Sequence, residues 1–290
     1  MARQCDAIHP RAVFGAAGVK TPARAKFARA QMGPPNFHVN YDPALGAEAQ
    51  SIAQAVLQTA EGDLGKLVAI FGMPPAHGPF VIDVTGVDPS GQPFSGAAHS
   101  GDGGLNIWCN PLNPETNQLD AQWTKMLVVA EVVEDFEVWQ GQGWDLLHTN
   151  GEGLSRLLAS ALYPDVIPQS RAAVANAYLQ AGMPDCINDN SRPDTDTVGN
   201  GGAVLFLNWL TTQLGYDYSQ VAQHGADTLA GVYANLQKRS DAYERFVADL
   251  KLLPQGGVTS DNPFPVFPTQ MNVRTAHVAA QATGPLKFAV

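Results

Sequence analysis

The chain has 290 residues, of which 45% are hydrophobic and 15% charged, and its formal net charge at pH 7 is −10. This composition is typical of a globular protein and excludes a disordered, collagen-like or coiled-coil chain. No run of about 18 apolar residues occurs, so the sequence predicts no membrane-spanning helix. An acidic chain without a basic stripe on its body is a poor nucleic-acid binder. We expect neither nucleic acid nor a membrane among its partners.

The acidity is unevenly distributed along the chain. Residues 1–33 contain six basic residues and one acidic residue, whereas the rest of the chain contains 11 basic and 26 acidic residues. We predict a basic N-terminal arm over residues 1–33 that packs against the acidic body or against a second copy, giving a homo-oligomer. A targeting peptide is the alternative, because an Arg-rich, acid-poor segment also fits one. The arm has no Ser and no apolar central region, and the compartment, extracellular or cytoplasmic, stays open.

The three cysteines are Cys5, Cys109 and Cys186, and they are widely spaced with no Cys-x-x-Cys pair. An odd number of cysteines allows at most one internal disulfide. This spacing excludes a disulfide-dense scaffold and a zinc ribbon, while the disulfide state itself stays open.

The first part of the chain alternates strands with one helical region. Apolar periodicity and β-branched content predict strands at 37–41, 80–84 and 105–109 and a helix at 47–71. The helical region is either continuous or broken near Gly62, and Gly72 is expected to end it in the left-handed conformation. A turn at 88–91 follows the second strand, and residues 96–104 are expected to be flexible.

Beyond Pro114 the pattern is mainly helical. We predict helices at about 119–140, 151–162, 169–182, 201–214, 217–238 and 241–253. The last residues contain several prolines and then short β-like runs at 271–275 and 286–290. The layout predicts an α+β fold, with a small mixed sheet followed by a helical half. We divide the chain into the basic arm 1–33, an α+β subdomain 34–165, a helical subdomain 166–254 and a Pro-rich and β-like extension 255–290.

The central feature is the predicted helix that contains Glu131 and Glu134. Ten of the 17 residues from Trp123 to Trp139 are apolar residues other than alanine, so much of this helix is expected to be buried. The two glutamates lie three positions apart and therefore share one helix face. Eighteen positions after Glu134, the run Asn-Gly-Glu-Gly places Glu152 at the start of the next helix.

This order of elements resembles the catalytic domain of the gluzincin zinc metallopeptidases, over about residues 36–165. Those families carry His-Glu-x-x-His on the first active helix and a glutamate ligand, often within an Asn-Glu-Gly run, on the next. The resemblance implies a zincin-like fold, with Glu131 as general base, Ala130 and Glu134 at the positions of the zinc-binding histidines, and Glu152 as third ligand. The chain departs from the family because it reads Ala-Glu-Val-Val-Glu there, and no His-Glu-x-x-His occurs elsewhere. The helix therefore lacks the imidazole or thiolate ligands of an ordinary zinc site.

Three carboxylates that meet in a partly buried cleft cannot all stay ionised and unpaired. If Glu131, Glu134 and Glu152 converge, one outcome is a raised carboxyl pKa and a proton-sharing pair able to act on a substrate such as a glycoside. A second outcome is a divalent cation held by Glu134 and Glu152; oxygen ligands favour Ca²⁺, Mg²⁺ or Mn²⁺ over Zn²⁺. A third is a basic partner in a purely structural network.

A solvated acidic helix face is an alternative interpretation of the same residues. On a helical wheel Glu131, Glu134, Asp135 and Glu137 lie within one half of the helix, and a helix that faces water on that side would show the same pattern. The burial of these side chains distinguishes the two interpretations.

Further candidates for binding lie outside the two helices. His99 and His148 are candidates for substrate binding or for a mixed metal site, although neither has ligand spacing to the first helix. The resemblance also implies a Tyr or His from the helical part that stabilises an oxyanion. Tyr216, Tyr218 and His224 are the candidates, and helix capping with aromatic packing is their alternative role.

The loop at residues 185–200 is rich in oxygen ligands. Its Asp194-x-Asp196 pair suits Ca²⁺, although the Glu at the twelfth position of an EF-hand loop is missing. A turn followed by a helix cap is the alternative.

We therefore predict a hydrolase-type enzyme with a small-molecule, peptide or glycan substrate. Glu131 is the expected general base, and Glu134 and Glu152 are cation ligands or proton-sharing carboxylates. The alternative is a catalytically inactive peptidase-like protein with a binding or structural role. Fold alone does not choose between these two classes.

Overall fold

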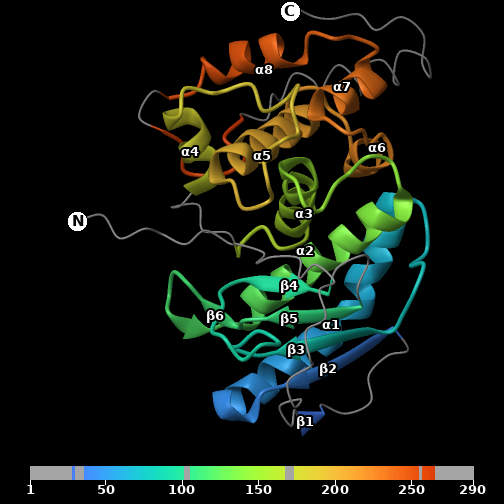
Figure 1. Cartoon of the computed structure of the whole chain (residues 1–290), viewed down its shortest axis with the longest axis vertical. Coiled ribbons are helices and arrows are strands. Elements are labelled where there is room, and N and C mark those ends of the chain that lie inside the picture. Colours follow the sequence, from blue (N-terminus) through green and yellow to red (C-terminus); the bar gives the residue numbers. More distant parts are fainter. Residues whose placement is uncertain (1–27, 30–35, 101–104, 167–172, 255–256, 265–290) are drawn as a thin grey trace, which may run out of the picture.

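The computed structural model describes residues 28–29, 36–100, 105–166, 173–254 and 257–264 (Figure 1). Within these residues, five strands form one sheet in the order β1-β2-β3-β5-β4. Their bounds are β1 Ala28–Arg29, β2 Phe37–Tyr41, β3 Phe80–Val84, β4 Ala97–His99 and β5 Asn106–Cys109. β2, β3 and β5 are parallel, whereas β1 and β4 pair antiparallel at the two edges. The predicted mixed sheet is confirmed.

The sheet is covered by the two longest helices, α1 (Ala47–Phe71) and α2 (Ala121–Gln140). Alternate strand residues, among them Phe37, Ile82 and Ile107, belong to the same buried core as apolar residues of these helices. α1 is one continuous helix, so the proposed break near Gly62 is wrong. Gly72 ends α1 with a φ of 70° and donates its N–H to Val68, as predicted.

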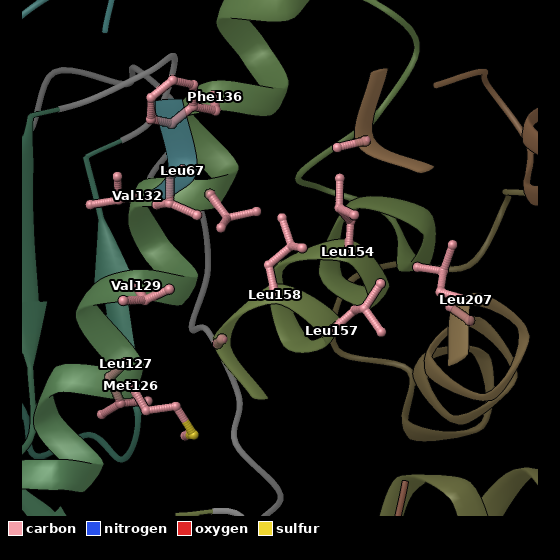
Figure 2. Packing of buried hydrophobic residues seen from close by; sticks show 14 of the residues in the cluster. Leu67, Met126, Leu127, Val129, Val132, Phe136, Leu154, Leu157, Leu158 and Leu207 are labelled. Atoms are coloured by element: carbon pink, nitrogen blue, oxygen red, sulfur yellow. The ribbon is translucent and has the colours of Figure 1, made fainter. Parts of the chain in front are cut away.

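α2 lies between α1 and α3 (Thr149–Leu162), and its ends follow from its capping residues. The Asp120 carboxylate accepts the N–H groups of Gln122 and Trp123, and Gly141 ends the helix with a φ of 61°. Figure 2 shows the leucines of α3 between the apolar side chains of α2 and Leu207 of α5 (Thr197–Thr212). Because α2 is packed on several sides, polar residues in its middle are enclosed by protein.

The remaining elements form a helical half at the opposite end of the molecule from the sheet (Figure 1). They are α4 (Ala173–Gln180), α5 (Thr197–Thr212), α6 (Tyr218–Gln223), α7 (Leu229–Gln237) and α8 (Ala242–Leu250). A short 3-10 turn, η1 (Pro43–Leu45), precedes α1, and β6 (Leu112–Asn113) pairs with β7 (Gln118–Leu119) before α2. The α+β fold with a helical half after the sheet is confirmed.

The single helix predicted over 217–238 is wrong, because the structure divides it into α6 and α7. Gly225 lies between the two helices, and a Cβ there would come within 2.5 Å of the Trp144 indole nitrogen. The Thr228 side chain then caps α7 by accepting the N–H of Gly231. Close packing on Trp144 and a new N-cap therefore override the helical periodicity.

Parts of the sequence predictions lie outside the described residues. These are most of the basic arm, residues 101–104 of the stretch expected to be flexible, and the β-like runs at 271–275 and 286–290. The described piece of the C-terminal extension packs on the helical half, where Asn176 exchanges two hydrogen bonds with Val258. The division at 165/166 stays a prediction. In the described residues no helix is both long and apolar enough to cross a membrane.

Candidate functional site: a buried histidine and carboxylate group

The acidic side chains of α2 are buried. Glu131 and Glu134 each expose 3% of their surface, and Asp135 and Glu137 expose none. The interpretation of this face as solvated is therefore wrong. The helix is enclosed by α1, α3 and the sheet, so four carboxyl groups lie inside the protein.

His99 joins two of these carboxyl groups from the sheet side. Its Nε2 lies 3.1 Å from Oε2 of Glu134. One ligand atom each from His99, Glu131 and Glu134 lies within 4.8 Å of the others, and all three residues are buried. We call these three residues the His–Glu–Glu group. The group combines edge strand β4 with one face of α2.

β4 is a strand within residues 96–104, where the sequence predicts a flexible stretch, so that prediction is wrong for Ala97–His99. The strand has three residues, too few to show a period, and it pairs antiparallel with β5 so that His99 lies opposite Ile107. Its formation depends on that tertiary pairing. The sequence does predict His99 as a candidate binding residue. It does not predict that His99 contacts α2, because the two are far apart along the chain and show no spacing typical of metal ligands.

The electrostatics of the group favour proton retention. Burial alone lowers the pKa of His99, but the hydrogen bond to Glu134 and the charges of Glu131, Glu134 and Asp135 together raise it to about 10. Burial raises the pKa of Glu131 well above its usual range, and the nearby Glu134 charge adds to this effect. Burial likewise raises the pKa of Asp135 to about 7. Without a bound cation, the group is expected to hold a charged imidazole and a neutral Glu131 at pH 7.

Glu152 is buried near this group but has its own partner. Its Oε1 accepts a hydrogen bond of 2.5 Å from Nε of Arg156, one turn further along α3. Burial raises the pKa of Glu152, and the Arg156 charge partly opposes that effect. Glu152 is not among the three residues with mutually close ligand atoms. The basic partner, one of the three expected outcomes, therefore applies to this glutamate, and the spacing of four residues to Arg156 could have identified it.

The Asn-Gly-Glu-Gly run at the start of α3 is explained by packing as well as charge. The buried Asn150 side chain donates to the carbonyls of Gly143 and Ala226 and accepts from the Asn190 amide. At Gly151, a Cβ would come within 2.6 Å of a Glu137 carboxylate oxygen. Asn150 therefore joins three loops, and Gly151 leaves room for a buried acid.

The loop at 185–200 uses most of its carboxylates locally. Asp196 caps α5 through the N–H of Val198 and pairs with Arg192 at 2.5 Å. The Asp189 carboxylate accepts from the backbone and hydroxyl of Ser191. The predicted turn and helix cap are confirmed. Asp194 differs, because it is half-buried and burial together with the Glu134 charge raises its pKa to about 6.

The other predicted binding residues make their described contacts outside the His–Glu–Glu group. His148 is half-exposed before α3, with its Nδ1 2.8 Å from Asp145 Oδ2. Tyr218 is the first residue of α6, and His224 follows the last residue of that helix. The side-chain amide of Gln223 donates to the Ile70 carbonyl and so holds α6 against the carboxyl end of α1. Tyr216 is half-buried against the core. Among the described contacts, no hydrogen bond joins these residues to the group.

The donor set determines what this site can hold. In the described part of the chain, Glu131 Oε2 and both carboxylate oxygens of Asp135 and Glu137 are buried without a hydrogen-bond partner. Such groups need protons or a cation. One imidazole nitrogen and two carboxylates suit Mn²⁺ or Zn²⁺, and the carboxylates alone would also suit Mg²⁺ or Ca²⁺. The residues of the group therefore fit a divalent cation. The cysteines that the structure describes, Cys109 and Cys186, are both buried and form no disulfide with each other.

Fold and site together define an α+β protein with a buried histidine–carboxylate group between its sheet and its helical half. No protein-family model matches the chain, and no curated protein matches it in sequence. Native leukotriene A4 hydrolase from Saccharomyces cerevisiae is a similar solved structure, with 16% identity and a TM-score of 0.47 over 90% of this chain and 44% of that chain. Yeast LTA4 hydrolase in complex with bestatin is similar at 17% identity and a TM-score of 0.48, over 88% and 43%. The chain thus spans less than half the length of these solved structures.

Proposed function

We propose that the chain is a hydrolase-type enzyme on a peptidase-like scaffold, and that its His–Glu–Glu group binds one divalent cation. The observation that carries this proposal is the mutual approach of three ligand atoms within 4.8 Å inside the protein. The buried and unpartnered Oε2 of Glu131 supports it, because a carboxylate oxygen in that state lacks either a proton or a cation.

Each residue of the group has a separate role in this proposal. Glu131 is the general acid–base: burial raises the pKa of its carboxyl in the cation-free protein, and a bound cation would take the place of that proton at one oxygen and leave the other oxygen to act as the base. Glu134 and His99 hold each other in position through their 3.1 Å contact and supply ligand atoms. A bound divalent cation would supply Lewis-acid polarisation of a substrate oxygen. Glu152, predicted as a cation ligand, is reassigned to an ion pair with Arg156 that fixes the start of α3.

The substrate class follows only in part from the site. A small molecule, a peptide or a glycan can each present an oxygen to a carboxyl group and a cation. His148, Tyr216, Tyr218 and His224 remain candidate substrate-binding residues, and a homo-oligomer formed through the basic arm remains part of the proposal.

The decisive experiment is metal analysis combined with calorimetric titration of Mn²⁺ and Zn²⁺. About one equivalent is expected in the parent chain, with at least tenfold weaker binding in Glu131→Gln and His99→Gln. Glu48→Gln, an exposed carboxylate in the first turn of α1, is the matched control and should bind as the parent does. A folded parent that binds neither metal would exclude the cation role.

A catalytically inactive, structural relative is the second candidate. The observation that favours it is pairing within the cluster, since His99 contacts Glu134 and Arg156 contacts Glu152 while all four side chains are buried. This candidate predicts no bound metal, and hydrolase assays with peptide and glycan substrates that do not respond to Glu131→Gln.

A further inference from the structure

The first turn of α3 lies directly on the acidic face of α2. At Gly151 an added Cβ would come within 2.6 Å of a Glu137 carboxylate oxygen, so the two helices approach closely there. Glu134 lies one turn before Glu137 on α2 and therefore shares that face. α3 in turn packs closely on α5, since a Cβ at Gly153 would come within 2.6 Å of the Ala203 side chain. Through α3, the helical half thus covers the buried carboxyl groups.

Buried contacts fix the amino end of α3 to its surroundings. The Asn150 side chain is fully buried and donates to the carbonyls of Gly143 and Ala226. The chain passes from α2 to the helical half through the short connection 141–148. In this connection the Trp144 indole is buried and donates to a carbonyl of α6 at 2.9 Å. Because the connection is short and well held, a rotation of the helical half against the sheet would have its pivot here.

A hydrogen bond from Tyr163 ties the other end of α3 to α1. Tyr163 follows the last residue of α3 and donates its hydroxyl to Oδ2 of Asp63 at 2.5 Å, and Oγ1 of Thr59 lies 3.5 Å from the same hydroxyl. The second Asp63 oxygen accepts from Lys66, whose side chain is 59% exposed. Burial and the hydrogen bond to Asp63 raise the pKa of Tyr163, so its hydroxyl keeps the proton that it donates.

Packing around this hydrogen bond is incomplete. Thr59 and Asp63 line a hollow between α1 and α2, together with Lys125 and Val129 of α2. Tyr163 itself is half-buried, so water can replace Asp63 as its partner when the two helices separate. The contact at the carboxyl end of α3 is therefore easier to break than the fully buried contacts at its amino end.

We propose that the helical half is a hinged cover over the acidic face of α2, and that the hydrogen bond between Tyr163 and Asp63 is the latch that holds it closed. When the latch opens, the carboxyl end of α3 moves away from α2, while its amino end stays attached at the connection 141–148. Such a rotation of one part of a chain about a short connection is a hinge motion. The inference concerns access to the His–Glu–Glu group, to which neither latch residue belongs, and it does not require that a cation binds there.

The test measures how fast a carbodiimide and glycine ethyl ester label the buried carboxyl groups of the full chain at pH 6, with mass spectrometry to identify the labelled residues. Tyr163→Phe and Asp63→Ala each remove one side of the latch. Each variant should accelerate the initial labelling of Glu131 and Glu134 at least tenfold. The double variant should label within twofold of the faster single variant, because both changes break the same contact. Tyr41→Phe is the matched control, since Tyr41 is also half-buried against the core and its hydroxyl makes no hydrogen bond among the described contacts.

Two other carboxyl groups serve as references within each sample. Glu48 is exposed on α1 and should label quickly and equally in every variant, whereas Asp83 is buried in β3 and should stay as slow as in the parent. Thermal unfolding verifies that each variant is folded, and either folded latch variant is sufficient for the test.

The possible results separate a latch from a general loss of stability. Unchanged labelling of Glu131 and Glu134 in a folded latch variant overturns the cover. Equal acceleration at Asp83 also overturns it, because the whole fold would then open more often. The same acceleration in Tyr41→Phe would contradict a specific role of Tyr163. Absence of Mn²⁺ binding in the parent, in contrast, would overturn the proposed cation site and leave the cover in place.

Discussion

Nε2 of His99 lies 3.1 Å from Oε2 of Glu134, although the two residues are 35 positions apart and belong to different layers of the fold. His99 comes from an edge strand of the sheet, and Glu134 comes from a helix packed between the sheet and α3. The contact places a basic group beside the most acidic part of the interior. The charge state of this pair therefore links the stability of the fold to pH and to cation binding.

The first prediction concerns the pH dependence of the cation-free protein. The pKa of His99 is raised from 6.5 to about 10, and that of Asp135 from 3.8 to about 7, so the folded chain binds more protons than the unfolded chain between these limits. Stability from such groups is complete below the unfolded pKa and is lost as pH rises through the folded pKa. The free energy of unfolding in urea with EDTA should therefore fall between pH 4 and pH 10.

A variant isolates the contribution of the histidine. His99→Gln should show a smaller decline than the parent between pH 6.5 and pH 10; the decline that remains comes from Asp135, Glu152 and Glu131, whose carboxyl pKa values are also raised. An unfolding free energy that is constant or increases from pH 7 to pH 10 in the parent chain would be incompatible with a charged His99.

The second prediction concerns Glu131→Gln. Without a cation, the amide removes a buried carboxyl group that has one unpartnered oxygen and that ionises as pH rises. The variant should be more stable than the parent by roughly 1–3 kcal/mol at pH 8 in EDTA. The order should reverse with saturating Mn²⁺, because ligand binding stabilises only the parent. Denaturation in urea under both conditions measures the two effects.

Only the combination of both results supports the cation site. A variant that is more stable in EDTA and also in Mn²⁺ would fit the structural alternative, in which Glu131 is a buried acid without a ligand. A variant that is less stable in EDTA would mean that the Glu131 carboxyl group makes a favourable interaction in the native state.

The third prediction concerns the ion pair on α3. Arg156→Gln removes the 2.5 Å partner of Glu152 and leaves that carboxylate buried, which should cost about 3–5 kcal/mol at pH 8. The double variant Glu152→Gln/Arg156→Gln should recover part of this loss, because the buried Glu152 carboxyl group is removed together with its partner. The Arg156 charge also opposes the rise that burial causes in the pKa of the Asp261 carboxyl, so the recovery is not complete. Urea denaturation of the parent, both single variants and the double variant gives the coupling energy. A coupling energy near zero would show that the pair contributes nothing to stability.

The sequence allowed good prediction of elements whose hydrophobic period repeats several times. The strands at 37–41 and 80–84 and the helix at 47–71, with its end at Gly72, agree with the prediction, and α2 begins within two residues of the predicted start. It failed where tertiary contacts decide the backbone, as at β4, which is too short for a period. The break between α6 and α7 is another such case, because it depends on how Gly225 packs against Trp144.

The candidate site shows the same limit. The burial of Glu131 and Glu134 was one of two open interpretations, since the pattern of α2 also fits a solvated acidic face. The contribution of His99 could not be predicted, because a histidine on a separate strand has no fixed spacing to a helix. The Glu152–Arg156 pair, in contrast, is a local contact at four-residue spacing and was readable from the sequence.

The fourth prediction compares two glycines in helices. A Cβ at Gly201 of α5 would come within 1.9 Å of the Val174 carbonyl oxygen of α4, whereas a Cβ at Gly65 of α1 would meet nothing within 4 Å. Gly201→Ala must therefore push two helices apart, which should cost about 1–3 kcal/mol or more. Gly65→Ala should stabilise the protein by about 0.5–1 kcal/mol, because alanine loses less backbone entropy in a helix.

Comparison of Gly201→Ala with Gly65→Ala controls for the intrinsic preference of alanine for helices, because this preference acts equally at both positions. Urea denaturation of both variants at the same pH of 6, below the raised pKa values of Asp135 and Glu152, keeps the electrostatics of the site equal while the packing effect is compared. Equal effects at Gly65 and Gly201 would contradict the close approach of α4 and α5. Since α3 packs on α5 through Gly153 and Ala203, separation of α4 from α5 should also disturb the start of α3. The Gly201 variant is therefore expected to bind Mn²⁺ more weakly than the parent, while the Gly65 variant is not.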